Sequence, residues 1–247
     1  MIWRLALPLS LGLASGASAL ELDAMSSAER DAFRAEVRAY ILENPEIIRE
    51  AIGVLQAREA EAERLNDIEL ARANADALFN DGHSFVGGNP DGDITIVEFM
   101  DYRCGFCKRA FPEVQNVLSA DGNIRYIIKE FPILGEPSVL AARYAIATQL
   151  VAGDDTYKVV HDTLMEFQGE ISNQALARLS ESFDLDHDAI AAMMDDDKVG
   201  DIITENRALA QQLQISGTPT FVVEDQMLRG FLPADEMLAV VAELRAE

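Results

Sequence analysis

Cys104 and Cys107 are the two cysteines of the chain, and two residues separate them in the sequence Cys-Gly-Phe-Cys. The pair stands immediately before a predicted helix, so its sulfurs would lie at a helix N-terminus, which stabilises a thiolate. Cys104, at the exposed end, would then be the attacking sulfur. Cys107, one helical turn in, would be buried and would resolve a mixed disulfide. The spacing therefore predicts thiol-disulfide chemistry.

Other uses of a Cys-x-x-Cys pair fit this sequence less well. A structural zinc site needs four ligands, but there is no second such pair, and the histidines lack ligand spacing (His83, His161 and His187). Covalent haem attachment needs a histidine at position 108, which is lysine. A disulfide that closes so small a loop would add little stability. A two-coordinate Cu(I) site on the two thiolates stays open.

The composition is that of a globular and strongly acidic protein. A length of 247 residues with 49% hydrophobic content allows a sizeable core and a second small unit. The formal net charge of −23 repels nucleic acid and anionic lipid head groups, so we discount both as partners.

The first residues have the pattern of a secretory signal peptide. One cation precedes a short apolar run, and small residues at 17–19 supply a cleavage site after Ala19. The run is shorter than the roughly 20 residues that a bilayer core requires, which argues against a membrane anchor. We therefore expect residues 1–19 to be removed and the mature protein to be soluble and exported, to a compartment in which disulfides persist.

Residues 20–82 are expected to form a helical N-terminal arm. Ser26 to Glu29 has the spacing of a capping box, and apolar residues follow at helical intervals. Asn44 and Pro45 suit the start of a second helix, which would run without a breaker to about residue 79 and extend roughly 50 Å. So long a helix suits an oligomerisation arm, although a helix folded back on its own domain stays open.

The residues that follow a turn at 87–92 show an α/β pattern. A strand, the helix with the cysteines and a second strand follow one another from residue 94 to 131, which predicts a βαβ unit with parallel strands. Residues 138–213 have the apolar spacing of several short helices. Two further strands, at 220–224 and 227–231, indicate a hairpin, and a last helix follows them.

Two motifs resemble the thioredoxin superfamily. In Glu98 to Pro112, a Cys-x-x-Cys pair stands at a strand-to-helix junction, with a proline five residues after its second cysteine. Gly217-Thr-Pro-Thr220, which opens a strand, is similar to the cis-proline loop of that superfamily. The long gap between these motifs suits the DsbA-like branch, which has a helical domain inserted there. The resemblance implies a thioredoxin fold over residues 83–247 with an all-helical insertion at about 138–213, preceded by the helical arm.

Two shorter stretches resemble a subgroup of that branch. Lys129 to Gly135 and Tyr40 to Glu46 are similar to the Com1 and ScsC-type proteins. In this subgroup an N-terminal helical segment oligomerises the protein. The resemblance therefore implies a homo-oligomer formed through residues 20–80.

The resemblance also assigns roles to single residues. Pro219, in a cis peptide, would hold its loop against the cysteine helix, and the backbone of Thr218 would pair with an extended substrate. Glu98, six residues before the first cysteine, matches the family's buried acid and would exchange a proton with the second cysteine. A structural pairing of Glu98 with Lys129 stays open. Phe106 is a candidate for a peptide-binding surface.

The expected activity is that of a periplasmic thiol-disulfide oxidoreductase that acts on exported proteins with thiols or wrong disulfides. Gly105-Phe106 and Thr218 are more similar to the isomerase relatives than to the strong oxidant, which favours a disulfide isomerase or reductase. The resemblance implies no cofactor besides the redox-active Cys104-Cys107 disulfide, and a membrane thiol reductase or oxidase as partner. A DsbA-like dithiol oxidase and a Cu(I)-binding copper-tolerance protein are the alternatives.

Overall fold

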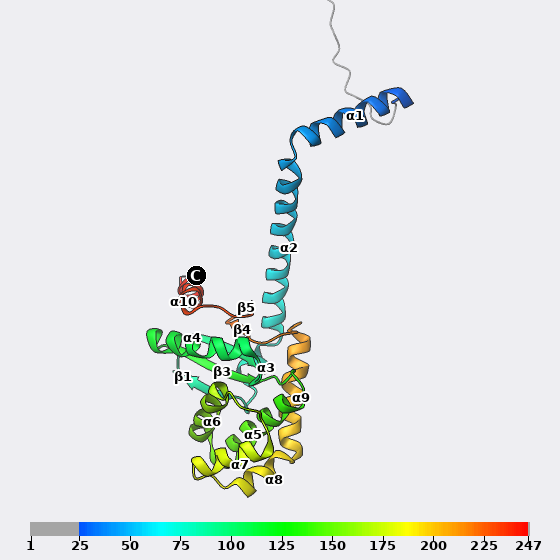
Figure 1. Cartoon of the computed structure of the whole chain (residues 1–247). Coiled ribbons are helices and arrows are strands. Elements are labelled where there is room, and N and C mark those ends of the chain that lie inside the picture. The colour runs from blue at the N-terminus through cyan, green and yellow to red at the C-terminus, as the bar shows by residue number, and fades with distance from the viewer. Residues whose placement is uncertain (1–24, 247) are drawn as a thin grey trace, which may run out of the picture. The chain divides into compact units, whose positions relative to one another are not determined.

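The computed structural model describes residues 25–246, in two compact units that divide after Arg58 (Figure 1). The predicted signal peptide, residues 1–19, lies outside the described residues. In the part of the chain that is described, every helix is too short or too polar to cross a membrane.

The first unit contains α1 (Ser27–Glu43) and the beginning of α2 (Glu46–Ala73). The predicted capping box is present: the Ser26 hydroxyl accepts from the Glu29 amide, and the Glu29 carboxylate accepts from the Ser26 amide. Helix α1 has no buried residue. Most of the large apolar side chains of α1 and of the first turns of α2 are exposed (Phe33, Val37, Tyr40, Leu42, Ile48, Ile52, Val54 and Leu55).

The long helix that the sequence predicts to residue 79 is interrupted at Asn74. Helix α2 ends at Ala73, and a short helix, α3 (Ala75–Phe79), follows. The Asn74 side-chain amide donates to the Leu70 carbonyl at 2.8 Å, and this carbonyl also accepts from the Asn74 backbone amide at 3.2 Å. The prediction of an unbroken helix was wrong because a single Asn carries no strong break signal within an Ala- and Glu-rich segment.

A five-stranded sheet forms the centre of the second unit, in the order β1-β3-β2-β4-β5. Strands β2 (Ile94–Met100) and β3 (Ile124–Glu130) are parallel, as predicted, and β4 (Thr220–Val223) and β5 (Gln226–Arg229) form the predicted hairpin. Strand β1 (Phe85–Gly88) pairs antiparallel with β3 and was not predicted, because its two glycines indicate a turn. Gly88 has a positive φ, and any side chain there would collide with the Ile124 carbonyl.

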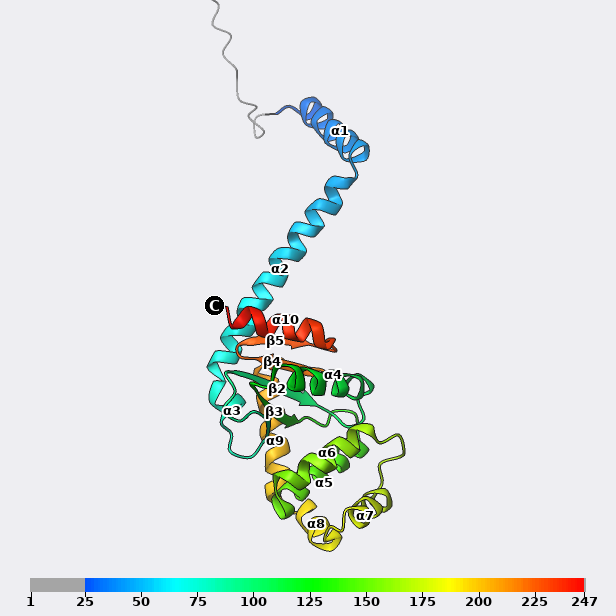
Figure 2. The ribbon, with the colours of Figure 1, turned by 90° about the vertical axis from the view of Figure 1, so that its left-hand side faces the viewer.

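Helices cover both faces of this sheet (Figure 2). Helices α4 (Gly105–Asp121) and α10 (Ala234–Leu244) pack together over one face, in a core that includes Ile96 and Val114. The other face packs against α3, the end of α2 and α9 (Asp197–Gln212), in a smaller core. That core contains Ala71 and Leu78 beside Val97 and Phe99 of β2.

The predicted helical insertion lies between β3 and β4. It consists of α9 and four helices that precede it: α5 (Glu136–Ala152), α6 (Asp154–Glu166), α7 (Asn173–Ser182) and α8 (His187–Met194). Helix α5 is the central one, since it contacts α6, α8 and α9. Much of this insertion shares one continuous core with α4 and its side of the sheet.

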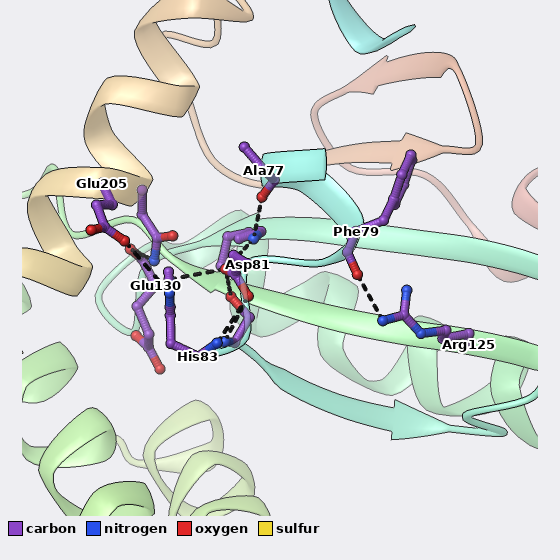
Figure 3. Close-up of polar contacts among 10 residues, drawn as sticks. Ala77, Phe79, Asp81, His83, Arg125, Glu130 and Glu205 are labelled. Atoms are coloured by element: carbon purple, nitrogen blue, oxygen red, sulfur yellow. Dashed lines mark hydrogen bonds and ion pairs between the residues drawn. The ribbon is translucent and has the colours of Figure 1, made fainter. Parts of the chain in front are cut away.

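A polar cluster around the buried Lys129 joins the segment after α3 to β3 and α9 (Figure 3). The ammonium of Lys129, on β3, binds the Asp81 carboxylate and donates to the Ala77 carbonyl at 2.8 Å. His83 lies 2.9 Å from Asp81 and 3.6 Å from Glu205 of α9. The ion pairs and hydrogen bonds to Asp81 outweigh its burial and hold its pKa far below the usual value.

Candidate active site

The cysteine turn stands between β2 and α4. Cys104 is the N-cap of α4, and its Sγ accepts a hydrogen bond from the Cys107 amide at 3.4 Å. Both cysteines are free thiols, and both are buried: Cys104 is 6% exposed and Cys107 is 0% exposed. Cys107 is buried as predicted, whereas Cys104 is less exposed than its place at the helix end suggested, because the loop before β4 covers it.

The two sulfurs have opposite acidities. The hydrogen bond from the Cys107 thiol is the largest cause that lowers the pKa of Cys104, to about 5. Burial opposes it, and the Cys107 and Phe106 amides support it. Burial, the hydrogen bond to Cys104 and the charge of Glu98 hold the pKa of Cys107 well above its usual value. At neutral pH, Cys104 is therefore the thiolate and Cys107 the thiol.

The loop before β4 contacts the cysteine turn, although the two segments lie far apart in the sequence. The Thr218-Pro219 peptide bond is cis, as the motif predicts. The Cys104 sulfur lies 3.1 Å from the Thr218 carbonyl oxygen, to which the protonated thiol can donate. The Pro219 carbonyl in turn accepts from the Gly230 amide at 2.9 Å, after the end of β5. The two motifs thus form one site, at which backbone groups border the nucleophile.

Glu98 lies in the middle of β2 and points into the core beneath α4. It shares its sheet face with Ile94 and Ile96, as the strand alternation predicts, and it is fully buried. The Tyr126 hydroxyl donates to its Oε2, while Oε1 has no partner among the described residues. Burial raises the pKa of Glu98 to about 7, against the effect of the Tyr126 hydrogen bond. Its unpaired oxygen and raised pKa suit a group that gains and loses a proton.

Lys129 is not the partner of Glu98. Although the two residues stand on adjacent strands, Glu98 is opposite Ile128 in the register, so the Lys129 side chain points to the other sheet face. There it is paired with Asp81. The structural pairing that the sequence left open was wrong, because neighbouring positions on a strand face opposite sides.

Glu130 is a second buried acid near the site, and the sequence reasoning missed it. Its Oε1 accepts from the hydroxyls of Tyr102, at 2.7 Å, and Tyr157, at 2.8 Å, and burial raises its pKa to about 8. His161 lies 3.0 Å from the Tyr102 hydroxyl, and burial lowers its pKa to about 3. The sequence did contain a signal for its burial. Glu130 follows Tyr126 and Ile128 at intervals of two, so the three side chains share one face of β3.

Phe106, between the cysteines, is 54% exposed at the surface of the turn. The Arg109 guanidinium stacks over its ring at 4.3 Å and lies 5.5 Å from the ring of Phe231. Lys108 points elsewhere: its ammonium donates to the Leu164 carbonyl at 3.2 Å and so joins α4 to the end of α6. Phe106 is thus available for contact with another chain.

A low-pKa cysteine before a helix, a buried partner cysteine and an adjoining cis-proline loop form the arrangement that the sequence resemblance implied. A model described as a DSBA-like thioredoxin domain matches residues 95–242. The chain belongs to this DsbA-like family. A second model, described as the copper resistance protein ScsC N-terminal domain, matches residues 29–62. Together they support the ScsC-type resemblance and the order of helical segment and thioredoxin fold.

Two curated relatives differ greatly in length from each other. Na(+)/H(+) antiporter NhaA 1 of Salinispora arenicola is 30% identical over 156 residues, 63% of this chain and 24% of that protein. The chain thus spans about a quarter of the antiporters that it matches. Disulfide bond formation protein D of Bacillus subtilis is 26% identical over 164 residues, 62% of this chain and 72% of that protein.

Solved structures extend the likeness over most of the chain. A thioredoxin-like oxidoreductase from Silicibacter pomeroyi is 40% identical, with a TM-score of 0.66, and the match covers 70% of this chain and 99% of that one. A linker-deletion mutant of Proteus mirabilis ScsC is 27% identical, with a TM-score of 0.66, over 90% of this chain and 98% of that one. The chain thus resembles DsbA-like and ScsC structures over most of its length, N-terminal helices included.

Proposed function

We propose that the protein is a periplasmic disulfide isomerase or reductase of exported proteins. The observation that carries this proposal is the Cys104 sulfur, with a pKa of about 5, placed 3.1 Å from the Thr218 carbonyl at the cis-proline loop. A thiolate is the nucleophile in disulfide exchange, and a neighbouring backbone segment can pair with an extended client.

The proposed reaction begins with attack of the Cys104 thiolate on one sulfur of a client disulfide. A new Cys104-client disulfide forms, and the other client sulfur leaves as a thiolate. In isomerisation, a different client thiolate then attacks the bound client sulfur, so Cys104 leaves as a thiolate and the client keeps a rearranged disulfide. No net oxidation or reduction of the enzyme occurs.

In reduction, Cys107 completes the cycle instead. Its thiol loses a proton to the carboxylate of Glu98, and the resulting thiolate attacks the Cys104 sulfur. The Cys104-Cys107 disulfide forms, and the client leaves with both of its sulfurs reduced. The partner proposed to return the enzyme to its dithiol form is a membrane thiol reductase. An oxidase would run these steps in reverse and would need an oxidant.

Isomerisation rather than oxidation is favoured by the resemblance of Gly105-Phe106 and Thr218 to isomerase relatives. It also agrees with a homo-oligomer formed through residues 20–80, because several active sites around one client raise the effective concentration for repeated exchange. Export to the periplasm is proposed from the signal-peptide pattern of residues 1–19.

Trapping of the mixed disulfide tests the proposal. Cys107→Ser leaves the Cys104 nucleophile but removes the resolving sulfur, so disulfide-linked adducts with exported clients should accumulate on non-reducing gels. Cys104→Ser is the matched control and should form none. If neither variant forms adducts with any client, the assignment of roles is wrong.

Copper binding at Cys104 and Cys107 is the second candidate, supported by the described function of the family that residues 29–62 match. The donor set fits Cu(I) only in part. A two-coordinate site needs two thiolates, whereas burial and the charge of Glu98 keep Cys107 protonated. We therefore expect the reduced protein to bind Cu(I) no more tightly than a simple dithiol does, which a competition titration would measure.

A further inference from the structure

Two neighbouring apolar side chains are exposed on the loop after β3. Ile133 is 38% exposed and Leu134 is 46% exposed. Among residues 59–246, the other exposed large apolar side chains lie singly, on separate helices or turns (Leu65, Phe106, Val151, Val159 and Phe183). Isolated apolar residues are ordinary on a protein surface, whereas an adjacent pair needs an explanation.

This loop lies beside the cysteine turn. Strands β2 and β3 are parallel, so the segments that leave their carboxyl ends begin at the same edge of the sheet. The Phe131 amide donates to the Met100 carbonyl at 2.9 Å, which continues the pairing beyond β3. The pair Ile133-Leu134 therefore stands next to the segment that ends at Cys104.

The buried carboxylate of Asp101 joins the loop to the turn through four hydrogen bonds. Its Oδ2 accepts from the amides of Ile133, at 2.8 Å, and Leu134, at 3.1 Å. Its Oδ1 accepts from the Arg103 amide at 2.7 Å and from the Ser138 hydroxyl at 2.8 Å. The Asp101 carbonyl also accepts from the Cys104 amide at 3.0 Å. Asp101 thus joins the two segments, since its carboxylate binds the amides of the apolar pair and its carbonyl binds the Cys104 amide.

The rest of the loop backbone is also fixed. The Pro132 carbonyl accepts from the Arg207 guanidinium of α9 at 2.8 Å. The ring of Phe131 packs edge-on against Phe99, with 6.0 Å between ring centroids. The loop therefore presents two apolar side chains on an ordered backbone, which lowers the entropy lost when another chain binds them.

We propose that Ile133 and Leu134 form a client-binding surface beside Cys104, and that Asp101 is the positioning residue that holds it there. The occupant is an extended client segment with an apolar side chain close to the cysteine that bonds to Cys104. The surface adjoins the active site, so a client sulfur that reaches Cys104 brings its neighbouring residues against it. This proposal rests on the proposed function, and it adds a preference for apolar sequence around the client cysteine.

Two peptides test it, each with one disulfide and of equal length, one with Leu and the other with Ser next to the cysteines. Ile133→Ser and Leu134→Ser should each raise KM for the Leu peptide by about fivefold, as expected for loss of contact with one half-exposed apolar side chain. KM for the Ser peptide should change less than twofold. Equal changes for both peptides, or none, would overturn the proposal.

Val151→Ser is the matched control, because Val151 is 39% exposed, much as Ile133 is. It lies near the far end of α5, about 20 Å from Ser138 along the helix at 1.5 Å per residue. It should leave both KM values unchanged. If Val151→Ser raises KM for the Leu peptide as much as Ile133→Ser does, the effect is not local to this surface and the proposal fails.

Asp101→Asn tests the positioning role. Asn has one acceptor oxygen, so it cannot bind both the Ile133-Leu134 amides and the Arg103-Ser138 donors. KM for the Leu peptide should rise more than that for the Ser peptide; a loss confined to kcat would contradict this role. If Asp101→Asn does not fold, the Ile133 and Leu134 variants decide the matter alone. Failure of the unmutated protein to exchange either peptide would reject the proposed function itself, and this inference with it.

Discussion

Proton transfer at the resolving cysteine depends on the surroundings of one carboxylate. Glu98 is buried, keeps one oxygen without a partner among the described residues, and has a pKa of about 7. Its ionised form can accept the Cys107 proton, and its neutral form can return it. The Cys104 charge contributes to this raised pKa and is absent from a mixed disulfide, so the pKa of Glu98 should be somewhat lower there.

We predict that Glu98→Gln slows resolution of a mixed disulfide about a hundredfold, the usual contribution of a positioned base, and slows the first attack much less. In the unmutated protein the resolution rate should rise with pH through a midpoint at or slightly below 7, and this inflection should vanish in the variant. Rapid-quench measurement of both steps would check it.

Tyr126→Phe is the matched control, because it removes the hydrogen bond to Glu98 and keeps the acid. That bond lowers the pKa of Glu98, so the midpoint should move upward without loss of the inflection. Equal slowing of both chemical steps in Glu98→Gln would indicate a structural acid instead.

The same carboxylate should make stability depend on pH. Folded Glu98 keeps its proton up to about pH 7, whereas the unfolded chain loses it near 4.5, so the stability that this group lends to the folded state falls as pH rises between these values. Glu98→Gln removes the effect. The variant should match the unmutated reduced protein at pH 4 and exceed its free energy of unfolding by about 3 kcal/mol at pH 8.

Urea denaturation at the two pH values would measure this difference. Exposed Glu170→Gln is the control and should change the free energy of unfolding by no more than about 0.5 kcal/mol at either pH. A stabilisation by Glu98→Gln that is the same at pH 4 and pH 8 would show that ionisation of this side chain is not its cause.

At the scale of elements, the parallel βαβ unit and the hairpin were predictable because long apolar runs and turn residues mark them. The edge strand β1 was missed because Gly87 and Gly88 indicate a turn, while their backbone can pair with β3. Asp101 was missed for a different reason. Its role depends on amides of a loop more than 30 residues away, and no local pattern relates those segments.

The cluster around Asp81 yields a prediction for how the elements are held together. Asp81 follows α3 and pairs with Lys129 of β3. Asp81→Asn would leave the buried Lys129 ammonium without this counter-ion. We expect the free energy of unfolding at pH 7 to fall by about 3–5 kcal/mol, the usual cost of breaking a buried pair. Asp76→Asn, on the exposed surface of α3, is the control and should have little effect. A loss below about 1 kcal/mol for Asp81→Asn would mean that the lysine finds another partner.

At the scale of the whole molecule, the question is where the proposed oligomerisation arm ends. The sequence assigns residues 20–82 to the arm, because no breaker interrupts the long helix predicted to about residue 79, which has only a sparse apolar stripe after Gln56. Ala71 and Leu78, however, pack in the smaller core of the second unit, which begins at Glu59. Buried and exposed apolar positions of a long helix look alike in sequence, so the stripe cannot show which part packs on the sheet.

Removal of residues 20–58 is therefore the informative truncation, because a deletion to residue 80 would also remove core side chains. The exposed apolar residues of the first unit would be lost, so light scattering should give a lower mass, that of a monomer, while cooperative unfolding is kept. Oxidation of a dithiol peptide should continue, since the site at Cys104 is intact. Refolding of a scrambled multi-disulfide protein should be lost, because repeated exchange would no longer occur between sites held close together. An unchanged mass after this deletion would place the oligomer contact outside the arm.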